Sequence, residues 1–171
     1  MAAGFADPDW VPQTVTAWAC SWADSDEVEF GLLPAADLYS LERRRVFLEP
    51  LVERILSADV LTGHNIRRFD MPVLQAECLR LGLPLVGPVL TQDTIRLPKS
   101  KGFKKGQDVM SVLLGVPLPK KSLNYQEWQD AYAEPDMATV RERVVGDVLQ
   151  HKQLRLRMME RGWLEAPRMW R

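Results

Sequence analysis

This sequence has few cysteines, no long apolar run and almost no net charge, and each shortage removes a class of protein. Its two cysteines, Cys20 and Cys78, lie far apart among 171 residues and match neither a disulfide framework nor a zinc pattern, so a reduced compartment is expected. No apolar run approaches the ~20 residues that span a bilayer. The N-terminus also lacks the basic and then apolar layout of a signal peptide. We therefore predict a cytoplasmic protein with no membrane partner.

The charge balance and the length set further limits. The formal net charge is -1 and the isoelectric point is about 6.1, which argues against a protein that grips a polyanion by bulk positive charge. An acidic site that works through bound metal ions stays open, because the ions supply the positive charge there. With 46% apolar residues, the chain is long enough for one core and too short for two comfortable ones, so we predict a single domain over residues 1–171.

The pattern of apolar residues and turn residues predicts strands early and helices late. A strand at 14–22 has a hairpin partner at 28–31, and a helix at 41–57 is interrupted or reset at Pro50. The later elements are a strand ending at 60–62, a strand at 89–95 and helices at 107–114, 122–133 and 136–161. This order is typical of an α/β or α+β layout with helices packed on a sheet.

The segment GHNIRRFDMPVL, residues 63–74, is the most informative stretch, because it places an amide and a carboxylate between an apolar strand and a helix. Gly63 lets the backbone turn tightly, and Asp70 is expected to cap the helix, which ends at Gly82. The helix buries one stripe at helical spacing, made of Met71, Leu74, Cys78 and Leu81. A plain cap does not require the five-residue step from Asn65 to Asp70, so this spacing favours a metal ligand at Asp70.

The same string resembles the second motif of the DnaQ-like (DEDD, ribonuclease H-like) 3′→5′ exonucleases, in which Asn and Phe-Asp recur at this spacing. Further along, VVGDVLQHKQL around Asp147 resembles the third motif, where an Asp on a late helix completes the metal site. The resemblance covers about residues 14–161, and its general shape is like that of small phage-encoded members. It implies a ribonuclease H-like mixed sheet with flanking helices, in a bacterial or phage-infected cell.

For function, the resemblance implies a metal-dependent 3′→5′ exonuclease that acts on the 3′ end of single-stranded DNA, in proofreading or nucleic-acid processing. Asp70 and Asp147 would be catalytic metal ligands of a two-ion Mg²⁺ or Mn²⁺ site. Asn65 and Phe69 would contact substrate, since a neutral amide is a weak ligand for a hard cation. Asp93 is expected to buttress the end of its strand rather than bind metal.

The first motif of the family, an Asp-x-Glu pair on a central strand, has no counterpart before Thr14. Residues 1–10 hold Asp7 and Asp9 beside Pro8, which breaks a strand. The comparison implies that the central strand is lost, leaving two unpaired edges in the sheet, so we expect little activity from this chain. The alternative is a catalytically inactive domain that binds nucleic acid or a DNA polymerase. A weaker option is a structural remnant without binding.

The third motif also departs from the family pattern, in which a Tyr four residues or a His five residues before the last Asp orients or deprotonates the water. Here Arg143 and Glu142 occupy those positions. An arginine stays protonated, whereas Glu142 could serve as a base. His151, one turn after Asp147 on the same helix face, is the other candidate base, unless it is an ordinary surface residue. His64 is expected to be structural.

Lysines gather in the connector at 98–106, PKSKGFKKG. A phosphate backbone could be tracked and a base stacked by Lys101, Phe103, Lys104 and Lys105. Lys120 and Lys121 would extend that surface. The plain alternative is a solvated surface loop, and the sequence leaves both interpretations open.

Overall fold

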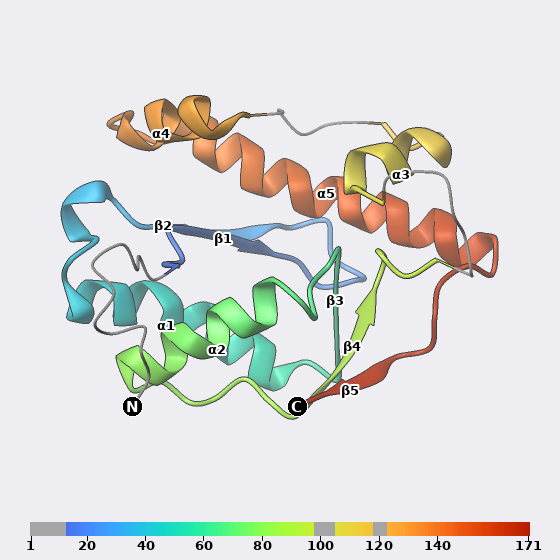
Figure 1. The fold of residues 1–171 in the computed structure, drawn as a ribbon, viewed down its shortest axis with the longest axis horizontal. Helices are drawn as coiled ribbons and strands as arrows, with labels where there is room; N and C mark the ends of the chain where they lie inside the picture. The colour runs from blue at the N-terminus through green and yellow to red at the C-terminus, as the bar shows by residue number, and fades with distance from the viewer. Residues whose placement is uncertain (1–12, 98–104, 118–122) are drawn as a thin grey trace, which may run out of the picture.

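The computed structural model describes residues 13–97, 105–117 and 123–171, and it has an α/β architecture in which helices cover both faces of β-structure (Figure 1). In chain order the elements are β1 (Ala17–Cys20), β2 (Glu29–Leu32), the 3₁₀ turn η2 (Ala35–Asp37), α1 (Leu41–Ser57), β3 (Val60–Gly63), α2 (Asp70–Leu81), β4 (Val89–Asp93), α3 (Gln107–Leu113), α4 (Tyr125–Ala133), α5 (Ala138–Glu160) and β5 (Arg168–Trp170). The predicted α/β class with a mixed sheet and flanking helices is confirmed at this level.

The predicted hairpin is present. Its first strand is shorter than expected, whereas the second has the expected length and begins one residue later. β1 and β2 are antiparallel, and Trp18 stands opposite Gly31. A Cβ atom at Gly31 would lie 2.3 Å from the indole nitrogen of Trp18, so the missing side chain makes room for the ring to lie across β2. The same indole nitrogen donates to the carbonyl oxygen of Phe47 on α1 at 3.0 Å. The hairpin is thereby joined to the first long helix.

A second sheet holds β3, β4 and β5 in that order. β3 and β4 are parallel, and α2 supplies the crossover connection that parallel strands need, while β5 runs antiparallel to β4. Among the described residues, neither β1 nor β3 pairs with a strand of the other sheet. The β-structure is therefore divided into a two-stranded and a three-stranded part.

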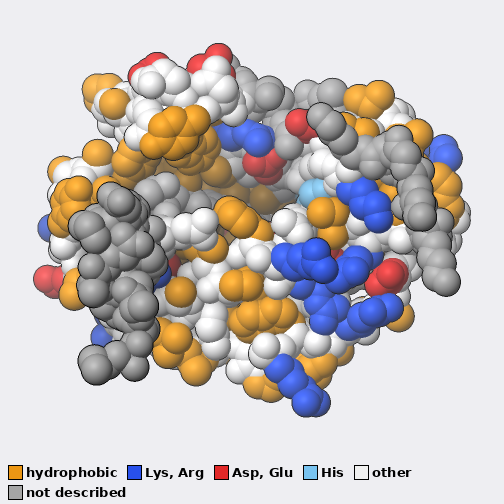
Figure 2. Space-filling model, in the orientation of Figure 1, with side chains coloured by type: hydrophobic (Ala, Val, Ile, Leu, Met, Phe, Trp, Pro, Cys, Tyr) orange, Lys and Arg blue, Asp and Glu red, His pale blue; other side chains and the backbone are white. Residues whose placement is uncertain are grey.

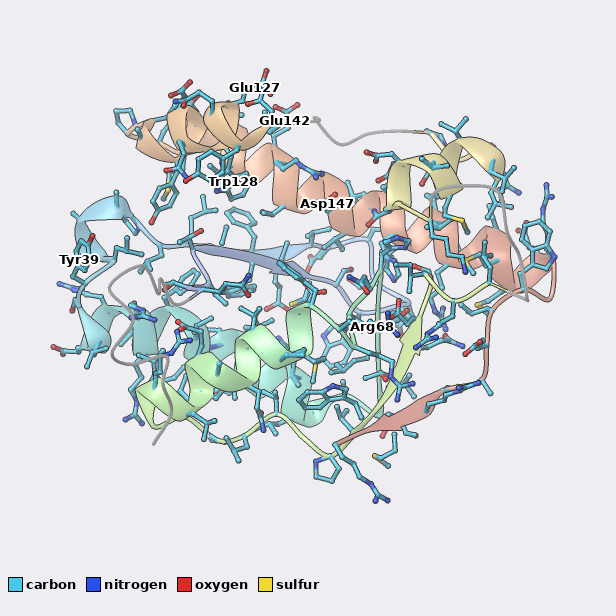
Figure 3. The ribbon with its side chains drawn as sticks, viewed as in Figure 1. Tyr39, Arg68, Glu127, Trp128, Glu142 and Asp147 are labelled. Carbon is cyan, nitrogen blue, oxygen red and sulfur yellow. The ribbon has the colours of Figure 1, made fainter. Side chains whose placement is uncertain are left out.

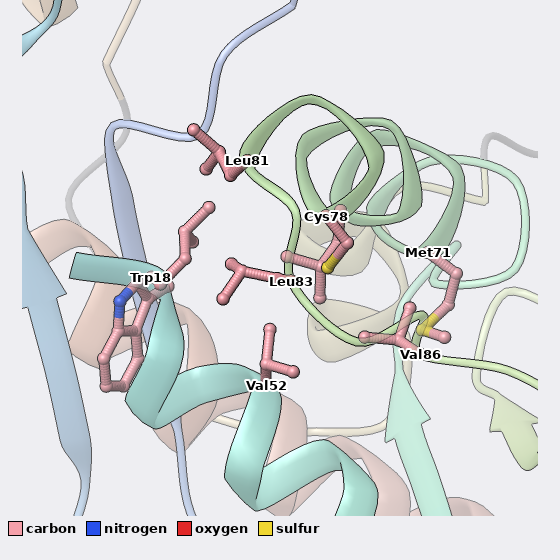
Figure 4. Close-up of a cluster of buried hydrophobic side chains, with 9 residues drawn as sticks. Trp18, Val52, Met71, Cys78, Leu81, Leu83 and Val86 are labelled. Atoms are coloured by element: carbon pink, nitrogen blue, oxygen red, sulfur yellow. The ribbon is translucent and has the colours of Figure 1, made fainter. Parts of the chain in front are cut away.

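Both sheets are covered by the same helices (Figure 1). On one side α5 packs on β1 and β2, and its His151 reaches Thr62 of β3. On the other side α1 and α2 enclose the largest buried cluster (Figure 4), whose members are Trp18, Leu48, Val52, Met71, Leu74, Cys78, Leu81, Leu83 and Val86. The shared helices make one packed unit of the two sheets.

Helix α1 is continuous through Pro50, so the expected interruption there is wrong. Pro50 is exposed, whereas Leu48 and Val52 are buried. The carbonyl group that loses its amide partner to the proline therefore faces the solvent side, where water can replace the hydrogen bond. Ser40 starts this helix by accepting from the amide of Arg43 at 3.3 Å.

Helix α2 buries the predicted stripe of Met71, Leu74, Cys78 and Leu81. It ends at Gly82 in the left-handed conformation, φ 63°, and the amide of Leu83 donates back to the carbonyl oxygen of Cys78 at 3.0 Å. The expectation that Asp70 caps the helix is wrong. Phe69 occupies the cap position without a side-chain bond, and Asp70 is the first helical residue.

The remaining differences lie at strand ends. The strand predicted at 89–95 stops at Asp93, where the chain turns, and β5 was not predicted, because three residues carry too little periodic signal.

Cys20 and Cys78 are free thiols. In the described part of the chain, no helix combines the length and the apolar character needed to cross a membrane.

Candidate active site

The loop from Gly63 to Phe69 joins β3 to α2 and is held by a buried carboxylate from the neighbouring strand. Asp93, 4% exposed, accepts from the amides of Asn65 at 2.7 Å and Arg67 at 3.4 Å. Asn65 has a left-handed backbone, φ 64°, which asparagine tolerates better than most residues. The predicted buttress role of Asp93 is confirmed, and the loop is fixed at the end of two parallel strands.

Gly63 serves this loop differently from what the sequence predicted. A Cβ atom there would lie 2.8 Å from the Cβ of Ile66, so a larger residue would collide with the loop that follows. The loop then closes on itself, since the amides of Arg68 and Phe69 both donate to the carbonyl oxygen of Asn65. The glycine is needed for this close approach.

Asp70 opens α2 beside two other carboxylates. Its pKa is raised from 3.8 to about 6, first by desolvation and then by the negative charges of Asp93 and Asp147, while a backbone hydrogen bond acts in the opposite direction. The residue nevertheless keeps contact with solvent. Carboxylates from α2, β4 and α5 therefore share one electrostatic neighbourhood.

Asp147 lies near the middle of α5, and its carboxylate is paired with the Arg143 guanidinium one turn earlier. The Asp147 carbonyl oxygen accepts from the Gln107 side-chain amide at 3.0 Å, which fixes the start of α3 against α5. The arginine thus stands where the family resemblance implies a tyrosine, and it neutralises the acid instead of activating water. Within residues 13–97, 105–117 and 123–171, no group of three His, Cys, Asp or Glu side chains is arranged to hold a metal ion.

Both histidines belong to a chain of hydrogen bonds beside these acids. His64 Nε2 lies 2.7 Å from the carbonyl oxygen of Lys105, which can only accept, so Nε2 carries the proton. His64 Nδ1 lies 3.0 Å from the Thr94 hydroxyl, which also donates to the carbonyl oxygen of Gly63 at 3.3 Å. The same hydroxyl lies 3.4 Å from His151 Nδ1, and His151 Nε2 lies 3.1 Å from the Thr62 hydroxyl. Both nitrogen atoms of each ring therefore have polar partners, which agrees with a structural role of His64.

His151 is only 9% exposed, so its interpretation as a surface residue is wrong. Burial lowers the pKa of the ring to about 3, and the charges of His64 and Arg155 act in the same direction. A ring with both nitrogens occupied is poorly placed to take a proton from water. The candidate role of His151 as a base remains a prediction that this geometry opposes.

Glu142, the other candidate base, is exposed and lines a shallow hollow over the outer strand of the hairpin. The hollow is formed by Asp26, Val28, Phe30, Arg141, Glu142, Val145 and Leu149. Figure 3 shows Glu142 near Glu127 of α4, while Asp147 lies further along α5 above Arg68. The structure therefore does not bring Glu142 to the carboxylates.

The residues predicted to contact substrate differ in how far they are exposed. Asn65 is half-buried in the loop, and Phe69 is 54% exposed beside Asp70. Lys105 is half-buried, and its carbonyl group is held by His64. The other residues predicted to contact a phosphate backbone or a base lie outside the described residues, namely Lys101, Phe103, Lys104, Lys120 and Lys121.

Sequence reasoning missed the arginines around this loop. Arg67 donates from its side chain to the carbonyl oxygen of Met169 at 2.7 Å, and Trp170 donates from its indole to the carbonyl oxygen of Arg67 at 3.3 Å. The double arginine at 67 and 68 was visible within the motif, but only β5 reveals which side of the loop it occupies. The hydroxyl groups of Thr62 and Thr94 carry no sequence signal of their own.

Replacing Asp70 by Asn is expected to raise the free energy of unfolding at pH 7 by on the order of 1 kcal/mol, after allowance for solvent screening. The folded protein holds this proton up to a pKa of about 6 and the unfolded chain only to 3.8, so stability falls as the pH rises through that window. Urea unfolding of both proteins at pH 7 and at pH 4 measures the effect, which should vanish at the lower pH. A less stable Asp70→Asn protein at pH 7 would contradict it.

Comparisons with family models, with curated proteins and with solved structures find no match for this chain.

Proposed function

We propose that this chain has the ribonuclease H-like fold of the DnaQ exonuclease type and acts as a metal-dependent 3′→5′ exonuclease on single-stranded DNA. One observation carries the proposal. Asp70 and Asp147 stand in two separate motifs, yet the charge of Asp147 contributes to the raised pKa of Asp70. Convergence of these two carboxylates is what the two motifs require for a shared site.

The two carboxylates fit part of a divalent-cation site. Their oxygen atoms are the ligands that Mg²⁺ and Mn²⁺ prefer, and the repulsion that raises the pKa of Asp70 is what a cation would relieve. Asp70 and Asp147 would hold the ions, which when bound activate water and stabilise the leaving oxygen in phosphodiester hydrolysis. Asp93 keeps the loop in place through its backbone amides and is already satisfied there.

The division of the β-structure supports the same proposal. β1 and β3 each lack a strand partner on one edge among the described residues, and α5 contacts both strands. In the family that the motifs resemble, the strand with Asp-x-Glu occupies the centre of the sheet. A strand at that position would bring two further carboxylates to the end of β3.

A second candidate is a catalytically inactive domain that binds nucleic acid or a DNA polymerase through the same region. The pairing of Arg143 with Asp147 favours it, because a guanidinium group already neutralises the carboxylate that should bind metal. Binding without hydrolysis would then be the surviving function.

The proposal is tested by comparing the chain as given with a form extended at its N-terminus by a strand that carries Asp-x-Glu. We expect very weak release of nucleotides from 5′-labelled single-stranded DNA by the first form, and release that depends on Mg²⁺ or Mn²⁺ by the second. Asp147→Asn should abolish the activity of the extended form, because it removes a metal ligand. Glu160→Gln, an exposed change near the end of the same helix, should leave it intact.

An inactive extended form that still binds DNA would overturn the enzyme proposal in favour of the inactive domain. Strong metal-dependent release by the chain as given, lost in Asp147→Asn, would show that other residues complete the site.

A further inference from the structure

Arginines gather around the ends of β4 and β5, next to the candidate site. We call this group the arginine surface, and it consists of Arg67, Arg68, Arg96, Arg155 and Arg168. Hydrogen bonds and register place three of its members together: Arg67 reaches Met169, Arg155 reaches Gln92, and Arg168 stands opposite Thr91. Arg68 follows Arg67 in the site loop, and the Arg96 amide donates to the carbonyl oxygen of Asp93 at the end of β4. Figure 2 shows Lys and Arg side chains collected on this face, below a hollow in which acidic and histidine side chains are visible.

The charges of this surface are poorly balanced by the protein itself. Arg67 and Arg155 donate to neutral oxygen atoms, a backbone carbonyl and a side-chain amide. Arg168 has an exposed ion pair with Glu165 at 3.3 Å, and Arg68 and Arg96 have no ion pair with any described residue. The nearby carboxylate of Asp93 is occupied by backbone amides.

Three of the four arginines of α1 show the opposite pattern. Arg44 pairs with Glu77, Arg45 with Glu49 and Arg54 with Glu29. A chain of net charge -1 thus neutralises most of the arginines of α1 and leaves positive charge on the arginine surface. Such a local excess attracts a polyanion only at close range.

An exposed aromatic ring adjoins the arginine surface. Phe69 is 54% exposed and lies between Arg68 and Asp70 in the chain. Guanidinium groups that meet phosphates, together with an open ring that stacks a base, are the combination that binds single strands without sequence preference.

We propose that the arginine surface binds the phosphate backbone of a single-stranded nucleic acid outside the carboxylate site, with Phe69 stacking one of its bases. The identity of the polymer rests on the proposed function. Binding is measured with EDTA present and without hydrolysis, so the two proposals can fail separately.

The test is fluorescence anisotropy of a labelled oligothymidine of about 20 nucleotides, long enough for one binding site, at several NaCl concentrations. In the variant Arg68→Gln, Arg96→Gln, Arg168→Gln the dissociation constant should rise at least about tenfold at low salt. The slope of log K against log [salt] should fall by about 2, as the loss of three phosphate contacts on a single strand predicts. Phe69→Ala should weaken binding about tenfold with an unchanged slope.

The matched control is Arg43→Gln, Arg45→Gln, Arg157→Gln, which removes the same charge from exposed positions on α1 and the end of α5. It should bind as the unchanged protein does. Equal weakening in both triple variants, or none in the first, overturns the inference, and so does failure of the unchanged protein to bind. If the first triple variant does not fold, Arg68→Gln and Arg96→Gln alone decide, since each should weaken binding.

Discussion

Lowering the pH from 7 to 4 is expected to reduce the free energy of unfolding by about 3 kcal/mol through His151 alone. The pKa of this ring falls from 6.5 to about 3 on folding, chiefly because the ring is buried, with His64 and Arg155 adding to the shift. Between those pH values the unfolded chain binds a proton that the folded chain does not. The stability is therefore present above pH 6.5 and is lost as the pH falls toward 3.

His151→Gln isolates this effect in urea unfolding at pH 7 and at pH 4. Glutamine takes up no proton, so the stability of the variant should depend less on pH by about the same 3 kcal/mol. At pH 7 the variant should be the less stable protein, because an amide replaces the ring imperfectly between Thr62 and Thr94. Carboxylates titrate in both proteins and cancel in the comparison. Equal losses between the two pH values would contradict the prediction.

Replacing Glu77 by Ala is expected to lower the free energy of unfolding by about 3–5 kcal/mol. This carboxylate is 0% exposed on α2. It accepts from Arg44 of α1 at 2.5 Å and from Arg80 one turn further along its own helix. The Arg44 side chain is only 11% exposed, so loss of the acid leaves a buried guanidinium charge without its partner.

Urea unfolding at pH 7 measures this loss, and Glu49→Ala is the matched control. Glu49 forms an ion pair with Arg45 on the same helix as Arg44, but both side chains are about half exposed. Such a pair contributes ~0–1 kcal/mol. The double change Arg44→Met, Glu77→Met should recover part of the stability lost in Glu77→Ala, because it removes both buried charges. Similar effects of Glu77→Ala and Glu49→Ala would show that burial of the first pair carries no energetic weight.

The fold was predictable wherever a signal repeats along the chain. The apolar stripe of α2 recurs over three helical turns before the glycine that ends the helix. The hairpin has strand-forming residues on both sides of a polar turn. Both elements were therefore predicted. The interruption predicted at Pro50 was wrong because the cost of a proline inside a helix depends on whether the proline faces water. Tertiary packing decides which side of the helix faces water. β5 was not predicted because its three residues form a strand only through pairing with β4.

Spacing along the chain singled out Asp70 and Asp147 as candidate ligands, and their metal role stays a prediction. The negative charges of Asp93 and Asp147 both raise the pKa of Asp70, so the three carboxylates influence one another electrostatically. Spacing could not reveal the environment of His151. The i+4 step from Asp147 suggested a shared helix face, whereas the ring turns to Thr62 of β3 and to Thr94 just after β4. The direction of a side chain on a long helix depends on what the helix covers.

The reciprocal hydrogen bonds between Arg67 and β5 link the order of the site loop to a marginal element. A strand of three residues, exposed along most of its length, opens at a small fraction of the global free energy of unfolding. When β5 frays, the Arg67 side chain loses Met169 and the Arg67 carbonyl group loses Trp170. The loop then keeps only the bonds from Asp93, those of His64 and its own backbone hydrogen bonds. The lifetime of the C-terminal strand thus limits how long the arginine surface keeps its shape, and residues remote from the carboxylates can tune the site.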